Sequence, residues 1–350
     1  MQNLSIRIND DVISEYSPPY IIAEMSANHN GSLENALALI EQAKLCGANA
    51  VKLQTYTADT MTLNSSNPDF MIRDGLWAGQ NLYALYESAY TPWEWHPVMF
   101  EKAKELGISI FSSPFDRTAV DFLEDLGAPA YKIASFEAID HPLIEYAAST
   151  GKPMIISTGM ADQDEIKEAI DVARQAGCNE LAVLHCVSGY PAPPSDYNLK
   201  TIADLESRFG VLAGLSDHTL SNTTALASVA LGARIVEKHF TLDRNAGGVD
   251  DSFSIQPEQL SALVRDCKEA WEAIGSVHYS KKDSEKENSK YRRSLYFVDN
   301  LRAGTVISNE HVRSIRPGFG LAPKELKKVI GKKLCVDVAG ATPVKWECFE

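Results

Sequence analysis

Short apolar runs rich in Ile, Val and Leu recur along the first 240 residues, and segments with a helical spacing of apolar residues separate them. The runs have the length of β-strands and are apolar almost throughout, which is typical of parallel strands buried on both faces. Between them apolar residues recur at intervals of three and four, as at Leu33, Leu37 and Ile40, which predicts amphipathic helices. The strand-like runs lie at residues 20–25, 50–54, 108–113, 130–135, 154–158, 181–186, 212–216 and 235–240.

A glycine follows each helix-like segment, and glycine is favoured just past a helix end because it enters the left-handed conformation cheaply. Eight strand–helix units within about 260 residues predict a (β/α)8 TIM barrel, an α/β fold that typically needs about 250 residues. The alternative is an open doubly wound sheet, which is disfavoured because no GxGxxG turn follows the first strand. The glycines are Gly47, Gly107, Gly127, Gly151, Gly177, Gly210, Gly232 and Gly275.

Two segments interrupt this repeat. Residues 57–91 form a long connection that contains Trp77, Tyr83 and Tyr86, and connections of this length are usually functional or mobile. The alternative is an insertion that packs on the outside of the barrel. Residues 276–290 are polar and charged without an apolar period, which is typical of a linker. We therefore expect a barrel domain at 1–278, a linker at 279–290 and a small strand-rich module at 291–350.

The charge is strongly negative and unevenly distributed. The 350 residues include 33 Lys and Arg against 47 Asp and Glu, for a net charge of −14, which argues against a nucleic-acid partner. Residues 291–350 carry 11 basic and 6 acidic residues, so this module has a net charge of +5 on a body of −19. Opposite charges favour docking of the small module on an acidic barrel.

Other features of the composition indicate a cytoplasmic protein. No run approaches the roughly 18 apolar residues of a membrane span, so we expect no membrane association. The first 16 residues, MQNLSIRINDDVISEY, lack the basic stretch and apolar core of a secretory signal. The six cysteines are scattered and form no CxxC pair, which fits a reducing compartment.

Polar residues stand at the end of every predicted strand, where a barrel of this kind places its active site. Lys52 and Lys132 combine two cations with nearby hydroxyl groups, a set that suits a phosphate or carboxylate. The alternative is that the lysines form structural ion pairs with Glu24 and Glu137. Those two carboxylates are also candidates for acid–base catalysis. The hydroxyl groups belong to Ser113, Ser135, Ser157 and Ser216.

Two histidines, His218 and His239, follow the seventh and eighth predicted strands. Neighbouring strands lie about 4.8 Å apart, so the two imidazoles can share one Mn²⁺- or Mg²⁺-like ion with open positions for substrate. Plain hydrogen-bonding histidines are the alternative. Cys186 stands beside His185, but adjacent strand residues point to opposite faces, so we expect a packing cysteine rather than a nucleophile.

Eight motifs, found in order along nearly the whole chain, resemble those of the sialic acid synthase family. The barrel carries seven of them and the C-terminal module carries one. They are AEMSANHNG at 23–31, VKLQ at 51–54, YKIAS at 131–135, STGM at 157–160, HCVSGYP at 185–191, GLSDHT at 214–219, EKHFTLD at 237–243 and RPGFG at 316–320.

The resemblance implies an enzyme that condenses phosphoenolpyruvate with an N-acetylated aldose, in a barrel followed by a small C-terminal antifreeze-like (SAF) domain. It implies catalytic roles for Lys52, Lys132, Glu24 as a base or water-orienting carboxylate, and Glu137 as a second acid or base. His218 and His239 would hold a divalent metal, Mn²⁺ foremost, with Mg²⁺ or Co²⁺ as alternatives. The phosphoenolpyruvate residues would be Lys52, Ser113, Lys132, Ser135, Ser157, Ser188 and Ser216.

For the sugar, the resemblance implies contacts from Tyr190, Asp250 and Arg316, the last supplied by the partner in a domain-swapped homodimer. The last barrel loop, GVDDSFS at 248–254, departs from the Gly-Pro-Asp-His that many N-acetylneuraminate synthases carry. With the aromatic connection and SSPFD at 112–116, it looks most like the pseudaminic acid synthase branch. That branch uses 2,4-diacetamido-2,4,6-trideoxy-β-L-altropyranose and cleaves the C–O bond of phosphoenolpyruvate. N-acetylneuraminate and legionaminate synthases are the alternatives.

Two hypotheses lie outside this reaction. A Schiff-base aldolase would use Lys132 on the fourth strand with pyruvate as donor, and it shares the barrel and a buried lysine. A sugar-binding or ice-binding protein would be built around the C-terminal module. The second hypothesis is disfavoured, because ice surfaces need weakly charged faces and this module carries a net charge of +5.

Overall fold

A computed structural model describes residues 4–350, in two compact units, Met1–Gly275 and Ser276–Glu350. Residues 1–3, the start of the 16-residue stretch that lacks the features of a secretory signal, lie outside the described residues. The division between the units falls where the polar stretch 276–290 begins. The linker borders at 279 and 290 remain predictions.

The first unit is built on a closed barrel of parallel strands in the order β10-β3-β4-β5-β6-β7-β8-β9. Each predicted apolar run overlaps one of these strands, with borders that agree to within two residues, so the (β/α)8 prediction is confirmed and the open doubly wound sheet is wrong. The strands are β3 Tyr20–Glu24, β4 Ala50–Thr55, β5 Ser109–Pro114, β6 Tyr131–Ile133, β7 Met154–Ser157, β8 Leu181–Cys186, β9 Leu212–Asp217 and β10 Ile235–His239.

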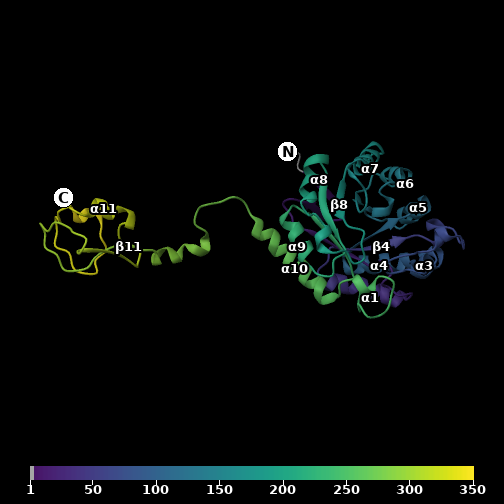
Figure 1. The fold of residues 1–350 in the computed structure, drawn as a ribbon, viewed down its shortest axis with the longest axis horizontal. Coiled ribbons are helices and arrows are strands. Elements are labelled where there is room, and N and C mark those ends of the chain that lie inside the picture. Colours follow the sequence, from purple (N-terminus) through teal and green to yellow (C-terminus); the bar gives the residue numbers. More distant parts are fainter. Residues whose placement is uncertain (1–3) are drawn as a thin grey trace. The chain divides into compact units, whose positions relative to one another are not determined.

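Helices surround the barrel, and neighbours along the chain such as α5, α6 and α7 lie side by side (Figure 1). The eight glycines that end the predicted helices all have positive φ angles. At Gly107 and Gly210 the φ angles are 65° and 60° and the glycine is itself the helix C-cap. The helices are α1 Leu33–Leu45, α4 His96–Leu106, α5 Arg117–Asp125, α6 His141–Ala148, α7 Gln163–Gln175, α8 Thr201–Phe209, α9 Thr223–Ala230 and α10 Pro257–Ile274.

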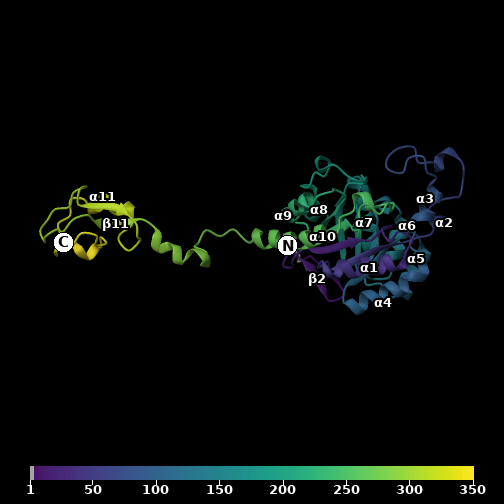
Figure 2. The same ribbon diagram turned by 90° about the horizontal axis from the view of Figure 1, so that it is seen from below.

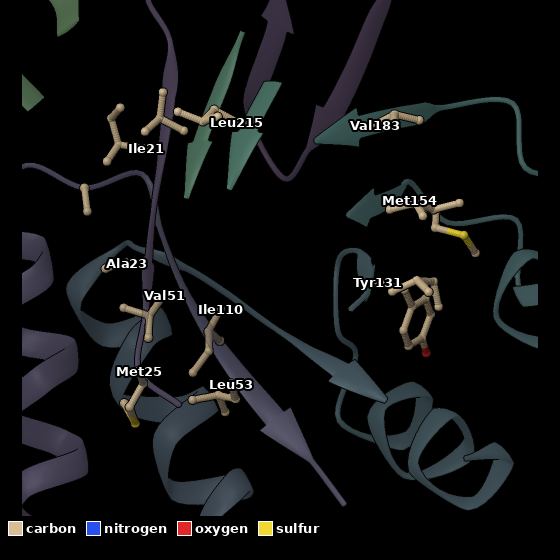
Figure 3. Packing of buried hydrophobic residues seen from close by; sticks show 14 of the residues in the cluster. Ile21, Ala23, Met25, Val51, Leu53, Ile110, Tyr131, Met154, Val183 and Leu215 are labelled. Atoms are coloured by element: carbon tan, nitrogen blue, oxygen red, sulfur yellow. The ribbon is translucent and has the colours of Figure 1, made fainter. Parts of the chain in front are cut away.

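Alternate strand residues face the helices and the lumen, because side chains along a strand point to opposite faces. The outward set, which includes Ile21, Val51 and Ile110, packs between the strands and the helices (Figure 3). The inward set, which includes Ile22 and Phe111, forms a separate cluster inside the barrel. This alternation decides which of the polar strand-end residues share the lumen.

An N-terminal hairpin of β1 Ser5–Ile8 and β2 Asp11–Ser14 was not expected from the sequence. Its residues Ile6, Ile8 and Ile13 are buried and join the inward apolar cluster. The lumen is therefore filled by apolar side chains at the end where the strands begin. Its polar side chains are concentrated at the end where the strands finish.

The connection at 57–91 contains two short helices, α2 Ala58–Met61 and α3 Leu82–Ala89. The segment between them loops out beyond both helices (Figure 2). Part of the connection packs against the barrel, where Tyr86 meets Tyr56 with ring centroids 5.7 Å apart. Trp77 instead donates a hydrogen bond from Nε1 to the carbonyl of Val249, 3.3 Å away in the loop after β10. The connection therefore reaches the active-site end of the barrel.

The second unit has its own core. The antiparallel pair of β11 Ser294–Phe297 and β12 Val312–Ile315 and the short helix α11 Leu326–Val329 surround buried residues such as Leu295, Phe297 and Val344. Within residues 4–350, no helix combines the length and the apolar character that crossing a bilayer requires.

Candidate active site

Four charged side chains meet inside the barrel, and we call Glu24, Lys52, Lys132 and Glu237 the inner cluster. Lys52 Nζ lies 2.7 Å from Glu24 Oε2 and 3.9 Å from Glu237 Oε1, and Lys132 Nζ lies 3.3 Å from the same Glu237 oxygen. All four residues are at most 5% exposed. Of the predicted ion pairs, Lys52 with Glu24 is therefore present. Glu137 forms none among the described residues, and Glu237 takes its place beside Lys132.

Burial and mutual attraction set the protonation of the inner cluster. Burial raises the pKa of Glu24, although Lys52 opposes this shift. Burial would also raise the pKa of Glu237, but Lys132 and Lys52 hold it below its ordinary value. Burial lowers the pKa of Lys132. With Glu237 ionised and Glu24 tending toward its neutral form, two ammonium groups face one firmly negative carboxylate, which leaves positive charge for an anion.

Three of the predicted serines line the same part of the lumen. Lys52 donates to Ser113 Oγ at 3.3 Å, and Ser216 Oγ donates to Glu237 Oε1 at 3.3 Å. Ser157 Oγ is buried without a hydrogen-bond partner among the described residues, and so is Glu237 Oε2. Buried polar atoms without partners are rare in folded proteins, so these atoms point to a ligand in the lumen.

Ser135 and Ser188 meet over Gly159, in the loops that follow β6, β8 and β7. The Gly159 amide donates to Ser135 Oγ at 3.2 Å, and Ser188 Oγ is a further buried atom without a partner in the described chain. A β-carbon on Gly159 would lie 2.2 Å from Ser188 Oγ and 2.9 Å from Ser135 Oγ. The glycine therefore leaves room for two hydroxyl groups that point into one space.

Glu137 stands apart from the inner cluster, at the end of a short turn, Ser135–Glu137, after β6. Burial raises its pKa to about 7, while Lys132 and Lys52 act in the opposite direction without contacting it. Its Oε2 atom is buried and has no partner among the described residues. A carboxyl group that titrates near neutral pH suits a general acid or base.

His218 and His239 lie together, with ring centroids 5.3 Å apart. His218 Nδ1 is 2.8 Å from the carbonyl oxygen of Val187, so this nitrogen carries a proton and donates it. The other ring nitrogen, Nε2, then carries the lone pair that can bind a metal ion. His239 Nδ1 is buried and has no hydrogen-bond partner in the described residues.

This arrangement fits a shared metal ion. A metal-binding histidine usually donates its other N–H to a carbonyl or carboxylate, as His218 does. The described residues contain no group of three or more His, Cys, Asp or Glu that could hold a metal by themselves. Two protein ligands leave positions for substrate oxygens, which is the pattern of a catalytic site rather than a structural one.

The predicted sugar residues in the barrel adjoin the histidines. The Tyr190 ring lies 4.4 Å from the His218 ring and 6.2 Å from the His239 ring. Asp250 is buried and accepts a hydrogen bond from Ser26, whose backbone is held at a φ of 48°. Ser26 is also 3.3 Å from the Gln54 amide, which in turn donates to Glu24 at 2.9 Å. A chain of hydrogen bonds thus joins Asp250 to the inner cluster.

Arg316 lies in the second unit, where it is exposed and directly follows β12. Its predicted role in the site remains a prediction.

Glu237 and Cys186 also lie in the site, although neither was among the predicted site residues. Glu237 accepts hydrogen bonds from both Lys132 and Ser216, and Cys186 Sγ lies 4.0 Å from His218 Nδ1. His185 points the other way, toward the carbonyl of Tyr197, so the expectation that it does not face Cys186 is confirmed. Counting every second residue along a strand from an inward position would have found both Cys186 and Glu237.

Comparison with known proteins gives the same two-part division. The NeuB family profile matches residues 39–279, and the SAF domain profile matches residues 292–350. A pseudaminic acid synthase from Campylobacter jejuni (strain 81-176) is 44% identical over 330 residues, 94% of this chain and 96% of that protein. A pseudaminic acid synthase from Helicobacter pylori is 40% identical, over 95% of this chain and 98% of its own length.

Similarity extends to other synthases and to solved structures. An N,N'-diacetyllegionaminic acid synthase from Legionella pneumophila is 36% identical over 95% of this chain and 94% of that protein. The crystal structure of a sialic acid synthetase from Leptospira borgpetersenii superposes with a TM-score of 0.73 at 31% identity. It covers 82% of this chain and 95% of that one.

Proposed function

Since the chain belongs to the NeuB family, we propose that it is a pseudaminic acid synthase. It condenses phosphoenolpyruvate with 2,4-diacetamido-2,4,6-trideoxy-β-L-altropyranose and water, and releases pseudaminic acid and phosphate. The observation that supports this choice of sugar is the sequence identity, which is 40–44% to pseudaminic acid synthases and 36% to an N,N'-diacetyllegionaminic acid synthase. N-acetylneuraminate and legionaminate synthases remain the alternatives. Its six cysteines are free thiols, which suits the cytoplasmic setting we propose.

Phosphoenolpyruvate binds in the inner cluster. Lys52 and Lys132 offset the charge of its phosphate and carboxylate, because ammonium groups in a water-excluded site stabilise anions strongly. The unpartnered hydroxyl groups of Ser157 and Ser188 donate to its oxygens, together with Ser113, Ser135 and Ser216. The anion thereby supplies the partners that these buried atoms lack.

The sugar lies beside phosphoenolpyruvate, against Tyr190 and Asp250. His218 and His239 would hold a divalent metal, Mn²⁺ foremost, which would supply Lewis-acid polarisation of the aldehyde carbonyl of the open-chain sugar. Asp250, fixed by Ser26, accepts hydrogen bonds from sugar hydroxyl or amide groups. This arrangement brings the aldehyde carbon to C3 of phosphoenolpyruvate, where the new bond forms.

After this bond forms, positive charge develops at C2 of the former phosphoenolpyruvate, and water adds there. Glu24 takes a proton from this water in its ionised form, which Lys52 at 2.7 Å favours against the effect of burial. Glu137, with its pKa near 7, supplies a proton to the alkoxide that forms at the former aldehyde. Collapse of the tetrahedral intermediate breaks the C–O bond, releases phosphate and leaves the 2-keto acid.

The experiment that tests the proposal uses the full chain with phosphoenolpyruvate and Mn²⁺. Phosphate release is compared between N-acetylmannosamine and the 2,4-diacetamido trideoxy sugar. We expect release with the second sugar, and a preference for N-acetylmannosamine would refute the pseudaminic assignment. In ¹⁸O-labelled water, label should enter the keto acid, and label confined to phosphate would contradict C–O cleavage.

The metal role has its own test. His218→Ala and His239→Ala should each abolish metal-dependent turnover and weaken Mn²⁺ binding, measured by calorimetry on the metal-free protein. Full activity after exhaustive chelation would contradict this role. The choice of ion follows from comparing Mn²⁺, Mg²⁺ and Co²⁺ added back to the chelated enzyme.

We also propose a domain-swapped homodimer in which Arg316 of one copy completes the sugar site of the other. A mixture of Lys132→Met and Arg316→Ala chains, each inactive alone, should then recover about a quarter or more of the activity of the wild-type dimer. No recovery in mixed dimers, verified by differential tags, would contradict the swap.

One observation favours a second candidate. Burial lowers the pKa of Lys132, which is what a Schiff-base lysine needs. Borohydride treatment in the presence of pyruvate would trap a covalent adduct on Lys132 if the chain were such an aldolase. Dependence on phosphoenolpyruvate and a divalent ion would exclude it.

A further inference from the structure

Three aromatic side chains form a row beside the paired histidines, and we call Trp77, Tyr190 and Phe253 the aromatic row. Tyr190 lies at its centre, with ring centroids 5.9 Å from Trp77 and 5.3 Å from Phe253. Phe253 in turn lies 5.0 Å from the His239 ring. Each member comes from a different connection, after β4, β8 and β10 respectively.

The contact between Trp77 and Tyr190 crosses the mouth of the barrel. In the closed strand order, β4 and β8 are four places apart in a ring of eight, so they stand on opposite sides. Trp77 belongs to the connection after β4, yet it reaches the Tyr190 ring after β8 and the Val249 carbonyl after β10. The indole therefore lies at the end of the barrel where the strands finish, which is the end that a substrate enters.

Trp77 presents an apolar surface to that substrate. Its single polar atom, Nε1, already donates to the Val249 carbonyl at 3.3 Å, so the ring has no further hydrogen bond to offer. The side chain is only partly buried, which leaves ring surface for a ligand to cover. A methyl group gains by covering such a surface, whereas a hydroxymethyl group loses hydrogen bonds to water there.

The order of side chains away from the histidines tells which end of the sugar meets this surface. The aldehyde carbon, C1, must lie at His218 and His239, and C6 is the far end of the six-carbon chain. The Tyr190 ring contacts the His218 ring at 4.4 Å and the Phe253 ring contacts the His239 ring at 5.0 Å, whereas Trp77 contacts Tyr190 at 5.9 Å and, within residues 4–350, neither histidine ring. We propose that Trp77 is a specificity-determining residue that favours sugars with a methyl group at C6 over sugars with a hydroxymethyl group. This inference rests on the proposed function.

The test compares two sugars that differ only at C6, namely the 2,4-diacetamido-2,4,6-trideoxy sugar and its 6-hydroxy counterpart. The wild-type ratio of kcat/KM should favour the 6-deoxy sugar by about 10- to 100-fold. Trp77→Gln keeps a donor for Val249 but loses the ring, and should lower this ratio about tenfold with KM for phosphoenolpyruvate unchanged. Trp77→Phe keeps a ring but loses the donor, and should keep the ratio.

Tyr83→Ala is the matched control, because Tyr83 lies in the same connection but contacts Asp59 rather than the aromatic row. It should keep the wild-type ratio. The opposite pattern, with Trp77→Phe losing the ratio and Trp77→Gln keeping it, would mean that Trp77 only anchors the loop, and would overturn the inference. A wild-type enzyme that uses both sugars equally would overturn it as well. Failure of the proposed function is distinct, because the wild type would then release phosphate with neither sugar.

Discussion

Two buried clusters, each of which pairs lysine with carboxylate side chains, lie on opposite faces of strand β10. Glu237 faces the lumen and belongs to the inner cluster, while its neighbour Lys238 faces outward and pairs with Asp217 at 2.7 Å. Lys238 also donates to the carbonyl oxygens of Thr219 and Ser221, at 2.7 and 3.2 Å, so its ammonium has three acceptors. Lys132 in the inner cluster has one, among the residues that the structure describes.

This difference separates a structural cluster from a ligand site. The Lys238 ammonium has three N–H donors, and three oxygens of the chain accept them, so the outer pair needs no ligand to satisfy it. The inner cluster keeps spare donors on Lys132, and within residues 4–350 neither its own Glu237 Oε2 nor the buried Ser157 Oγ has a hydrogen-bond partner. Burying polar groups without partners costs free energy, and a protein keeps them where a ligand completes them. Counting partners therefore identifies the site more sharply than counting charges.

The largest expected effect is on activity, from Lys132→Met. Loss of this cation should lower kcat/KM by about 10³- to 10⁴-fold, or about 4–5.5 kcal/mol of transition-state stabilisation. The loss of unfolding free energy should stay well below the cost of breaking a fully buried pair, about 3–5 kcal/mol, because Glu237 keeps Lys52 at 3.9 Å. Phosphate release and urea unfolding measure the two effects. A variant that lost stability and activity in parallel would show that the inner cluster is structural.

The outer pair should behave in the reverse way. Lys238→Met leaves the Asp217 carboxylate buried without its cation, and breaking such a pair costs about 3–5 kcal/mol of unfolding free energy. Urea unfolding measures this loss, and kcat per folded molecule should fall far less than in Lys132→Met. Adding Asp217→Asn should recover part of the stability, because it removes the unpaired charge. A loss below about 1 kcal/mol in the single variant would end the distinction between the clusters.

The sequence alone predicts the strands well, but it predicts poorly which side chains contact one another across the lumen. Burial on both faces makes each barrel strand an apolar run, and glycine marks each helix end, so all eight units were visible. The inner cluster depends on distances across the lumen instead. Lys132 on β6 meets Glu237 on β10, four places away in the closed ring, rather than Glu137 five residues along the chain. Strand alternation points Glu237 into the lumen, but only the closed ring of strands shows that it meets Lys132.

The N-terminal hairpin shows the same limit. Ile6, Ile8 and Ile13 lie in a stretch with mixed polar residues, and they are buried only because the barrel interior accepts them. Alternation along the strands is information that the sequence does contain. It places Glu237 and His239 on one face of β10 and Lys238 on the other. This is enough to assign Glu237 and Lys238 to different clusters.

Glu137 supplies a prediction on pH dependence. Its pKa rises from 4.5 in the unfolded chain to about 7 in the folded protein, so the folded state binds a proton more tightly. This contribution to stability is complete below about pH 4.5 and is lost as pH rises to about 7, by roughly 3 kcal/mol. Glu137→Gln removes the titration. The variant should therefore gain stability relative to wild type between pH 5 and pH 8, measured by urea unfolding. A difference that is constant across this range would place Glu137 in contact with solvent.

The smallest expected effect concerns the two hydroxyl groups above Gly159. In Gly159→Ala the new methyl group lies 2.2 Å from Ser188 Oγ and 2.9 Å from Ser135 Oγ, so Ser188 must rotate away and Ser135 must shift slightly, which side-chain hydroxyl groups can do. KM for phosphoenolpyruvate should rise about tenfold, or about 1.4 kcal/mol, with little change in unfolding free energy. Ser188→Ala should raise KM by a similar factor, and the double variant by less than the product, because both changes remove the same hydroxyl contact. Fully additive effects would mean that Gly159→Ala does not act through Ser188. An unchanged KM in Ser188→Ala would mean that its hydroxyl does not reach the substrate, and its unpartnered oxygen would then no longer distinguish the inner face of the barrel from the outer one.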